Sequence, residues 1–237
     1  MYKCCICHKQ ITSYYYNDWH GNKWCAEHSN ITKCATCGSI LTNSSQYIQV
    51  EPNRHVCKDC INNEVNPDNF NWVKQQVLKR LIKVGFQDIQ CDWINFKVVS
   101  KKEMNMLCQN AAGLHTACSI LNQTVYVLSH TNKIEFAAIL AHELLHSWQM
   151  QNNLNEYANY NTDDISKKVC EGFAQLGSFL IYSTIDHEYA KWRLEQMFRS
   201  TDEVYGIPFL KIYERFKQIG WYGIIREARQ QKLARLL

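Results

Sequence analysis

Two histidines four positions apart, His142 and His146, with Glu143 directly after the first, are the residues of this chain best suited to chemistry. They lie in the segment Ile134 to Met150, where apolar residues recur at helical spacing, so we expect a helix with one buried face. Side chains four apart on a helix project from the same face. Two imidazoles placed in this way can bind one zinc ion, with Glu143 beside a water molecule at the metal.

A catalytic zinc site needs a third protein ligand and one open position. Glu171 is the expected third ligand, because it follows His146 by 25 positions inside a second predicted helix, residues 164–184. The polar stretch 152–164 allows the chain to turn and return antiparallel, with the carboxylate facing the imidazoles. Gly172, next to Glu171, is expected to let the two helices approach closely.

This arrangement predicts hydrolysis of peptide bonds. Zinc polarises a carbonyl and lowers the pKa of water towards about 7, and Glu143 takes up the proton as general base and returns it to the leaving amine. We expect an extended peptide to pair with the strand Thr124–Leu128 as an added strand. Two alternatives are a structural histidine pair and a protein-binding adaptor or scaffold with a latent or inactive peptidase domain; an intact general base beside an open metal position favours the enzyme.

Cysteine spacing predicts two further zinc sites, because eight of the twelve cysteines precede residue 61, and seven of these together with His28 form ligand pairs with two residues between partners. Each site takes four ligands and is closed and structural, so it supplies folding energy that a segment poor in aliphatic residues lacks. The first cysteine site comprises Cys4, Cys7, Cys25 and His28, and the second cysteine site comprises Cys34, Cys37, Cys57 and Cys60. Alternative ligands remain at Cys5, His8, His20 and His55. Small buried apolar roles are expected for Cys91, Cys108, Cys118 and Cys170.

The elements that must position these residues indicate two domains and an α+β fold. Residues 1–62 are cysteine-rich and would form the double zinc module, and residues 63–237 would form the peptidase domain. The second domain starts with a predicted helix that ends at Gly85. A small antiparallel sheet is expected from strands at 93–99, 114–120 and 124–128, with Ser100 and Glu103 as a capping box for a short helix. Further helices are predicted at 133–152, 164–184, 187–199, 208–219 and 222–236, with Gly220 as a C-cap.

Composition and charge narrow the protein class. The hydrophobic fraction is 46% and the charged fraction 20%, which are ordinary values for a globular protein. The sequence contains no long apolar run and no secretion signal, and its cysteine usage favours a reducing compartment, so we expect a cytoplasmic protein without a membrane partner.

The formal charge of +4 is concentrated in residues 191–237, and metal-bound thiolates would make the N-terminal module net negative. Arg226, Arg229, Lys232 and Arg235 recur at helical spacing as a solvated face, so nucleic acid is not expected as a partner.

Taken together, the double zinc module, the segments His142–His146 and Glu171–Gln175 and the later Val204-Tyr205-Gly206 resemble the plant organ-size-regulating "DA-one" family of LIM peptidases. The resemblance covers nearly the whole chain. It implies a LIM-like module that can bind a protein partner and a gluzincin-like, zincin-type peptidase, with His142, His146 and Glu171 as metal ligands and Glu143 as catalytic acid and base. The sequence starts at its first cysteine pair, so we expect a short member without the ubiquitin-interacting segments of plant members. Five residues separate His28 from Cys34 where two are usual in a LIM domain.

Tyr205 is a further candidate for the site. A phenol near the metal can donate a hydrogen bond to the oxyanion that forms during hydrolysis. A packing role is the more common one for a tyrosine of this kind, and His115 and His187 are weaker candidates for the site.

Overall fold

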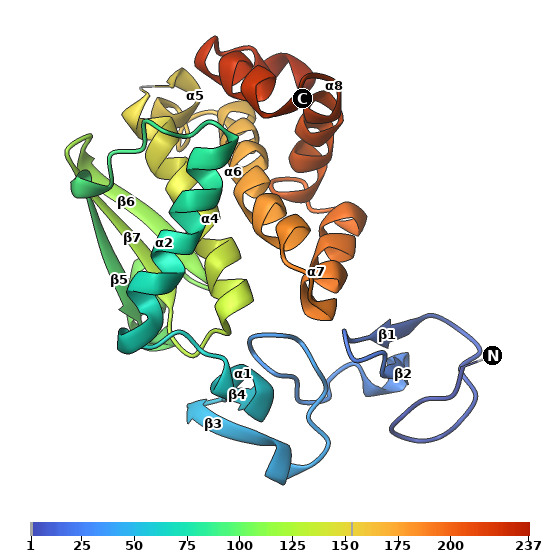
Figure 1. Cartoon of the computed structure of the whole chain (residues 1–237). Coiled ribbons are helices and arrows are strands. Elements are labelled where there is room, and N and C mark those ends of the chain that lie inside the picture. Colours follow the sequence, from blue (N-terminus) through green and yellow to red (C-terminus); the bar gives the residue numbers. More distant parts are fainter. Residues whose placement is uncertain (1, 153) are drawn as a thin grey trace. The chain divides into compact units, whose positions relative to one another are not determined.

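The computed structural model describes residues 2–152 and 154–237 as two compact units. Unit 1 comprises residues up to 66 together with 130–135, and unit 2 comprises residues 67–129 and 136–237. The predicted α+β class is confirmed: the described strands all lie before residue 129, the elements from residue 133 onward are helical, and both units hold small sheets (Figure 1). Among the described residues, no helix is long and apolar enough to cross a membrane.

Unit 1 consists of two short hairpins with a metal-ligating pair at the end of each. Strand β1 (Tyr15–Asn17) pairs with β2 (Lys23–Cys25), which the turn η1 (Ala26–His28) follows. The turn η2 (Ser44–Gln46), β3 (Tyr47–Glu51), β4 (Arg54–Cys57) and helix α1 (Lys58–Asn62) repeat this order. The two halves meet at buried Asp18, whose carboxylate accepts backbone N–H bonds from Asn22 in the first half and Ile40 in the second.

The interior of unit 1 is dominated by sulfur. Its buried aliphatic and aromatic side chains are few among the described residues, namely Trp24, Leu41, Val56 and Val65. A core of this size gives little hydrophobic free energy, so the two cysteine sites provide a natural source of stability for this unit.

The sheet of unit 2 has three strands in the order β5 (Ile94–Val99), β7 (Asn122–Leu128), β6 (Gly113–Ser119). The β6–β7 hairpin is antiparallel as predicted, whereas β5 runs parallel to β7 because the turn η3 (Cys91–Trp93) leads into β5 and helix α3 (Lys101–Leu107) carries the chain back across. The predicted capping box of Ser100 and Glu103 opens α3. Because β7 is paired on both sides, it cannot accept a further strand, and the predicted peptide-docking strand Thr124–Leu128 is wrong.

The helices account for most of unit 2 and follow the predicted order. They are α2 (Pro67–Val84), α4 (Lys133–Gln151), α5 (Asn155–Ala158), α6 (Asp164–Thr184), α7 (Glu188–Arg199) and α8 (Gly206–Arg229), followed by the turn η4 (Leu233–Leu236). Gly220, with φ of 64°, interrupts α8 at the predicted break. The predicted helix 222–236 stops earlier, since Gln231 has φ of 54° and separates α8 from η4.

Helix α4 runs through the middle of unit 2, and most of its residues are buried. Phe70 of α2 contacts both Phe96 of β5 and Phe136 of α4, which joins the sheet to the helices. At the other end, the Trp148 ring stacks on Phe173 of α6, and both meet Phe86. These contacts fix α4 and α6 relative to one another.

The close approach of α6 to α4 occurs at Gly177. A Cβ added there would lie 2.6 Å from the Ala141 carbonyl oxygen, so any larger residue would push the helices apart. The prediction that Gly172 allows α6 to approach α4 is wrong. Gly172 faces α8 instead, because a Cβ at that position would meet Pro208 at 2.7 Å.

Candidate metal centre

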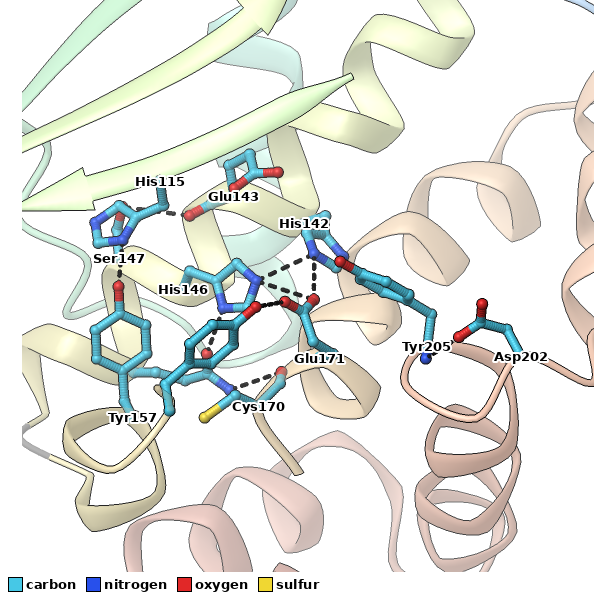
Figure 2. Close-up of polar contacts among 12 residues, drawn as sticks. His115, His142, Glu143, His146, Ser147, Tyr157, Cys170, Glu171, Asp202 and Tyr205 are labelled. Carbon is cyan, nitrogen blue, oxygen red and sulfur yellow. Dashed lines mark hydrogen bonds and ion pairs between the residues drawn. The ribbon is translucent and has the colours of Figure 1, made fainter. Parts of the chain in front are cut away.

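Helix α4 and helix α6 bring the three predicted ligands together (Figure 2). The Nε2 atoms of His142 and His146 are 3.1 Å apart, and Glu171 Oε2 lies 3.1 Å from the first and 3.3 Å from the second. Ligands at about 2.0–2.1 Å from a tetrahedral zinc are about 3.3 Å from one another. Two imidazole nitrogens and a carboxylate oxygen at these separations therefore fit zinc, and we call His142, His146 and Glu171 the metal trio.

Second contacts orient two ligands of the metal trio, His146 and Glu171. His146 Nδ1 lies 2.8 Å from Gln149 Oε1, and the Gln149 amide nitrogen donates to the Cys170 carbonyl oxygen at 3.1 Å. Since that bond fixes the amide, Gln149 presents its oxygen to His146, so Nδ1 carries the proton and Nε2 is free to bind metal. Tyr160 donates a hydrogen bond to Glu171 Oε1, which leaves Oε2 to face the imidazoles.

The electrostatics of the trio favour a metal dication. Although burial works against charge on both groups, the neighbouring carboxylate of Glu171 raises the pKa of His146 to about 9, and the imidazoles lower the pKa of Glu171 well below its ordinary value. A proton on His146 thus occupies the position that zinc would take.

Glu143 lies on α4 beside the trio but does not belong to it. Its side chain is buried, and burial raises the pKa of its carboxyl, while the imidazoles and the backbone N–H of His115 partly offset that increase. Gly113 of β6 faces it so closely that an added Cβ would lie 2.5 Å from Glu143 Oε1. A glycine at this position therefore makes room for the carboxylate.

The His115 contact identifies the free edge of the sheet. His115 opposes Val125 in the β6–β7 ladder, yet its N–H faces Glu143 instead of β7. In an antiparallel ladder, opposed residues that do not bond to each other point their backbone N–H and C=O groups away from the partner strand. The unpaired edge of β6 therefore passes directly beside the candidate general base.

The side chain of His115, a weaker candidate from the sequence, joins β6 to α5. Its Nε2 lies 2.9 Å from Gln123 Oε1, and its Nδ1 lies 2.6 Å from the Tyr157 hydroxyl. Gln123 donates its amide to the Ile120 carbonyl oxygen, so its oxygen must accept from His115 Nε2, and Tyr157 must donate to Nδ1. Burial lowers the pKa of His115 to about 4, which keeps this imidazole neutral.

Tyr205 lies at the other side of the trio, just before α8. Its ring centroid is 6.3 Å from that of His142, and 40% of the residue is exposed. Asp202 holds the preceding turn by accepting the backbone N–H groups of Val204 and Tyr205 at 2.9 and 2.7 Å. His187, the other candidate, caps α7 by accepting the Tyr189 N–H at 3.0 Å, which is a structural role.

The eight predicted ligands of unit 1 gather in two clusters that could hold zinc ions. In the first cysteine site, Cys25 Sγ lies 3.2 Å from His28 Nδ1 and 4.0 Å from Cys7 Sγ. In the second cysteine site all four thiols are buried, and Cys37 Sγ lies 3.8 Å from Cys57 Sγ.

The alternative ligands lie elsewhere among the described residues. His20 packs on the Trp19 ring and His55 meets Tyr47 edge to face, and neither Cys5 nor His8 belongs to a metal-sized cluster. The buried role expected for Cys108 and Cys118 is wrong: both are exposed, one just after α3 and the other on the β6 edge strand, whereas Cys170 is buried as predicted.

No protein-family model matches the chain, and comparisons with curated proteins and with solved structures give no significant match.

Proposed function

We propose that this protein is a zinc-dependent endopeptidase that cleaves peptide bonds in protein substrates. The convergence of His142 Nε2, His146 Nε2 and Glu171 Oε2 on one point, with buried Glu143 beside them, is the observation that carries the proposal. Zinc held by the metal trio would polarise the scissile carbonyl and lower the pKa of a water molecule.

Glu143 is the proton carrier in this proposal. Its raised pKa suits a group that must first accept a proton from the attacking water and later deliver it to the leaving amine. Neutral His115 and its N–H contact would hold the carboxylate in place. Tyr205, whose ring centroid lies 6.3 Å from that of His142, is the phenol proposed to donate to an oxyanion, because the hydroxyl of Tyr160 already donates to Glu171 Oε1.

The free edge of β6 is the proposed docking strand for the substrate. An extended peptide added there would exchange backbone hydrogen bonds with β6 and bring its carbonyls past Glu143. This assignment replaces the paired strand β7. It also accounts for the exposed outer residues of β6 from Thr116 to Ser119, which a partner strand would cover.

The wider biological setting belongs to the same proposal. The chain would be a gluzincin-like member of the "DA-one" group of LIM peptidases, active in the cytoplasm, with unit 1 available for a protein partner. Unit 1 carries exposed Tyr2, Tyr14 and Tyr15, and aromatic side chains of this kind are enriched in protein interfaces. The basic side chains of Arg226, Arg229, Lys232 and Arg235 are all exposed, in keeping with a solvated face.

The test compares the wild type with Glu143→Gln on casein and on a quenched peptide library. We expect hydrolysis by the wild type that a chelator abolishes and zinc restores. Glu143→Gln should retain all its zinc and lose at least about a hundredfold in rate, because a general base contributes about 10²–10⁴-fold. Exposed Glu195→Gln on α7 is the matched control and should keep full activity.

Two results would count against the proposal. Equal hydrolysis by Glu143→Gln would remove this residue as the base. A zinc-loaded wild type without activity on any substrate would favour the adaptor in which the domain binds metal without catalysis.

A further inference from the structure

The first turn of α4 belongs to unit 1, although the rest of the helix lies in unit 2. Three hydrogen bonds hold the approach to this turn. The Val65 N–H donates to the Thr131 carbonyl at 3.1 Å, the Lys133 N–H donates to the Asn63 carbonyl at 2.8 Å, and the Thr36 hydroxyl donates to the His130 carbonyl at 2.8 Å. The helix that carries His142 and His146 therefore starts inside the zinc-binding unit.

Asn132 lies directly before α4 and makes two kinds of contact. Its Oδ1 accepts the backbone N–H groups of Ile134 at 3.1 Å and Glu135 at 3.0 Å, which caps the helix. Its Nδ2 donates to Cys60 Sγ at 3.4 Å, and both residues are buried. Because the two backbone donors must face the amide oxygen, the amide nitrogen can only face the sulfur.

The sulfur of Cys60 is a good acceptor only in one chemical state. A neutral thiol accepts hydrogen bonds weakly, whereas a thiolate accepts them with the help of its charge. Cys60 belongs to the second cysteine site, and binding of zinc requires its ligands as thiolates. The buried amide of Asn132 is therefore matched to the metal-bound form of that site, and without metal it would face a poor acceptor.

We propose that Asn132 is a positioning residue that couples zinc in the second cysteine site to the start of helix α4, which carries His142 and His146. One side chain touches a metal ligand with its nitrogen and the first turn of α4 with its oxygen, so metal occupancy sets where the helix begins. The consequence for catalysis rests on the proposed function: His142 lies farther along the same continuous helix, so a displaced start would shift the metal trio and lower the rate.

The test separates the two contacts of Asn132 in the zinc-loaded full chain. Asn132→Ser keeps an oxygen that can cap the helix, but its short side chain cannot reach the sulfur, whereas Asn132→Ala removes both contacts. Exposed Asn63→Ser is the matched control, since only the backbone carbonyl of Asn63 contacts the α4 segment.

Two readouts need no hydrolysis. The first is alkylation of Cys57 and Cys60 in the presence of a chelator, followed by mass spectrometry, with Cys25 of the first cysteine site as internal reference. We expect Asn132→Ser to speed alkylation of Cys57 and Cys60 about tenfold, which is the scale of losing a contact to a metal ligand, and to leave Cys25 unchanged. The second is amide exchange of Ile134 and Glu135, which should rise several-fold in Asn132→Ser and further in Asn132→Ala.

Wild-type rates of alkylation and exchange in Asn132→Ser would overturn the proposal, as would equal changes in Asn63→Ser. If the wild type proves inactive on all peptides while Asn132→Ser shows both changes, the coupling stands and the proposed function fails. If the wild type is active, Asn132→Ser should lower kcat with little change in KM, because Asn132 contacts no substrate.

Discussion

Gly113→Ala tests how the sheet makes room for the candidate base. The added Cβ would lie 2.5 Å from Glu143 Oε1, 2.5 Å from Ile139 Cγ2 and 3.0 Å from Glu143 Cγ. Carbon and its non-bonded neighbours normally stay about 3.5–4.0 Å apart, so the carboxylate must retreat by about 1 Å. The three nearest atoms belong to Glu143 and Ile139 and not to the metal trio, so we expect the ligands to stay in place.

The size of the effect follows from that displacement. A misplacement of about 1 Å costs about a hundredfold in rate, equivalent to about 2.7 kcal/mol of transition-state stabilisation. In an unobstructed strand the same change would stabilise the fold slightly, because alanine loses less conformational freedom than glycine. A fall in kcat without loss of zinc is therefore a steric effect on Glu143.

The assay is steady-state cleavage of a quenched peptide, with zinc counted in the same samples. Asn95→Ala, at an exposed position of β5 outside the proposed site, is the control and should leave kcat unchanged. Wild-type kcat in Gly113→Ala would refute the reasoning, since it would mean that the carboxylate does not act from the place where it lies.

Three further predictions concern the residues around the metal trio. Tyr160→Phe removes the hydrogen bond to Glu171 Oε1 and should weaken zinc binding about 10–100-fold, measured by competition with a chelator; unchanged affinity would show that Glu171 needs no such support. The pKa of His146 is raised to about 9 in the metal-free site. Its proton therefore stabilises the metal-free folded protein fully below the unfolded pKa of about 6.5, and this stabilisation is lost as pH rises through about 9. Zinc affinity should therefore climb up to about pH 9 with proton release, which calorimetry in two buffers of different ionisation enthalpy would measure; no buffer dependence at pH 7 would contradict it. Tyr205→Phe should lower kcat at least about tenfold with KM nearly constant if its hydroxyl meets the oxyanion, and a smaller loss would assign Tyr205 to packing.

Sequence reasoning succeeded where geometry is local. Ligands four apart on a helix, or three apart in a turn, have their relative positions set by backbone geometry alone, as His142 with His146 and Cys57 with Cys60 illustrate. Glu171 required a tertiary step, but the polar stretch before α6 left one simple way for the chain to return. The grouping of these residues could therefore be predicted from the sequence alone.

The remaining features depend on contacts that spacing does not encode. The hairpin of β6 and β7 was predicted, but pairing of β5 with the far side of β7, which leaves β6 as the edge, depends on how α3 crosses over. Tyr160 supports Glu171 from the segment before α6, and the Cys170 carbonyl of α6 orients the Gln149 amide; both contacts depend on how the elements pack, and both residue types are common everywhere. The boundary predicted after residue 62 likewise gave no sign that residues 130–135 associate with unit 1, because that association depends on one asparagine and a few backbone bonds.

Three side chains from α4 and α6 would hold the catalytic zinc ion beside Glu143, and the proposed function depends on that ion. Anomalous diffraction at the zinc absorption edge, from crystals of the wild type grown without added chelator, tests its presence most directly. We predict three peaks, one at each cysteine site and one bounded by His142 Nε2, His146 Nε2 and Glu171 Oε2. Peaks at the two cysteine sites alone, in zinc-saturated protein, would contradict the proposed function.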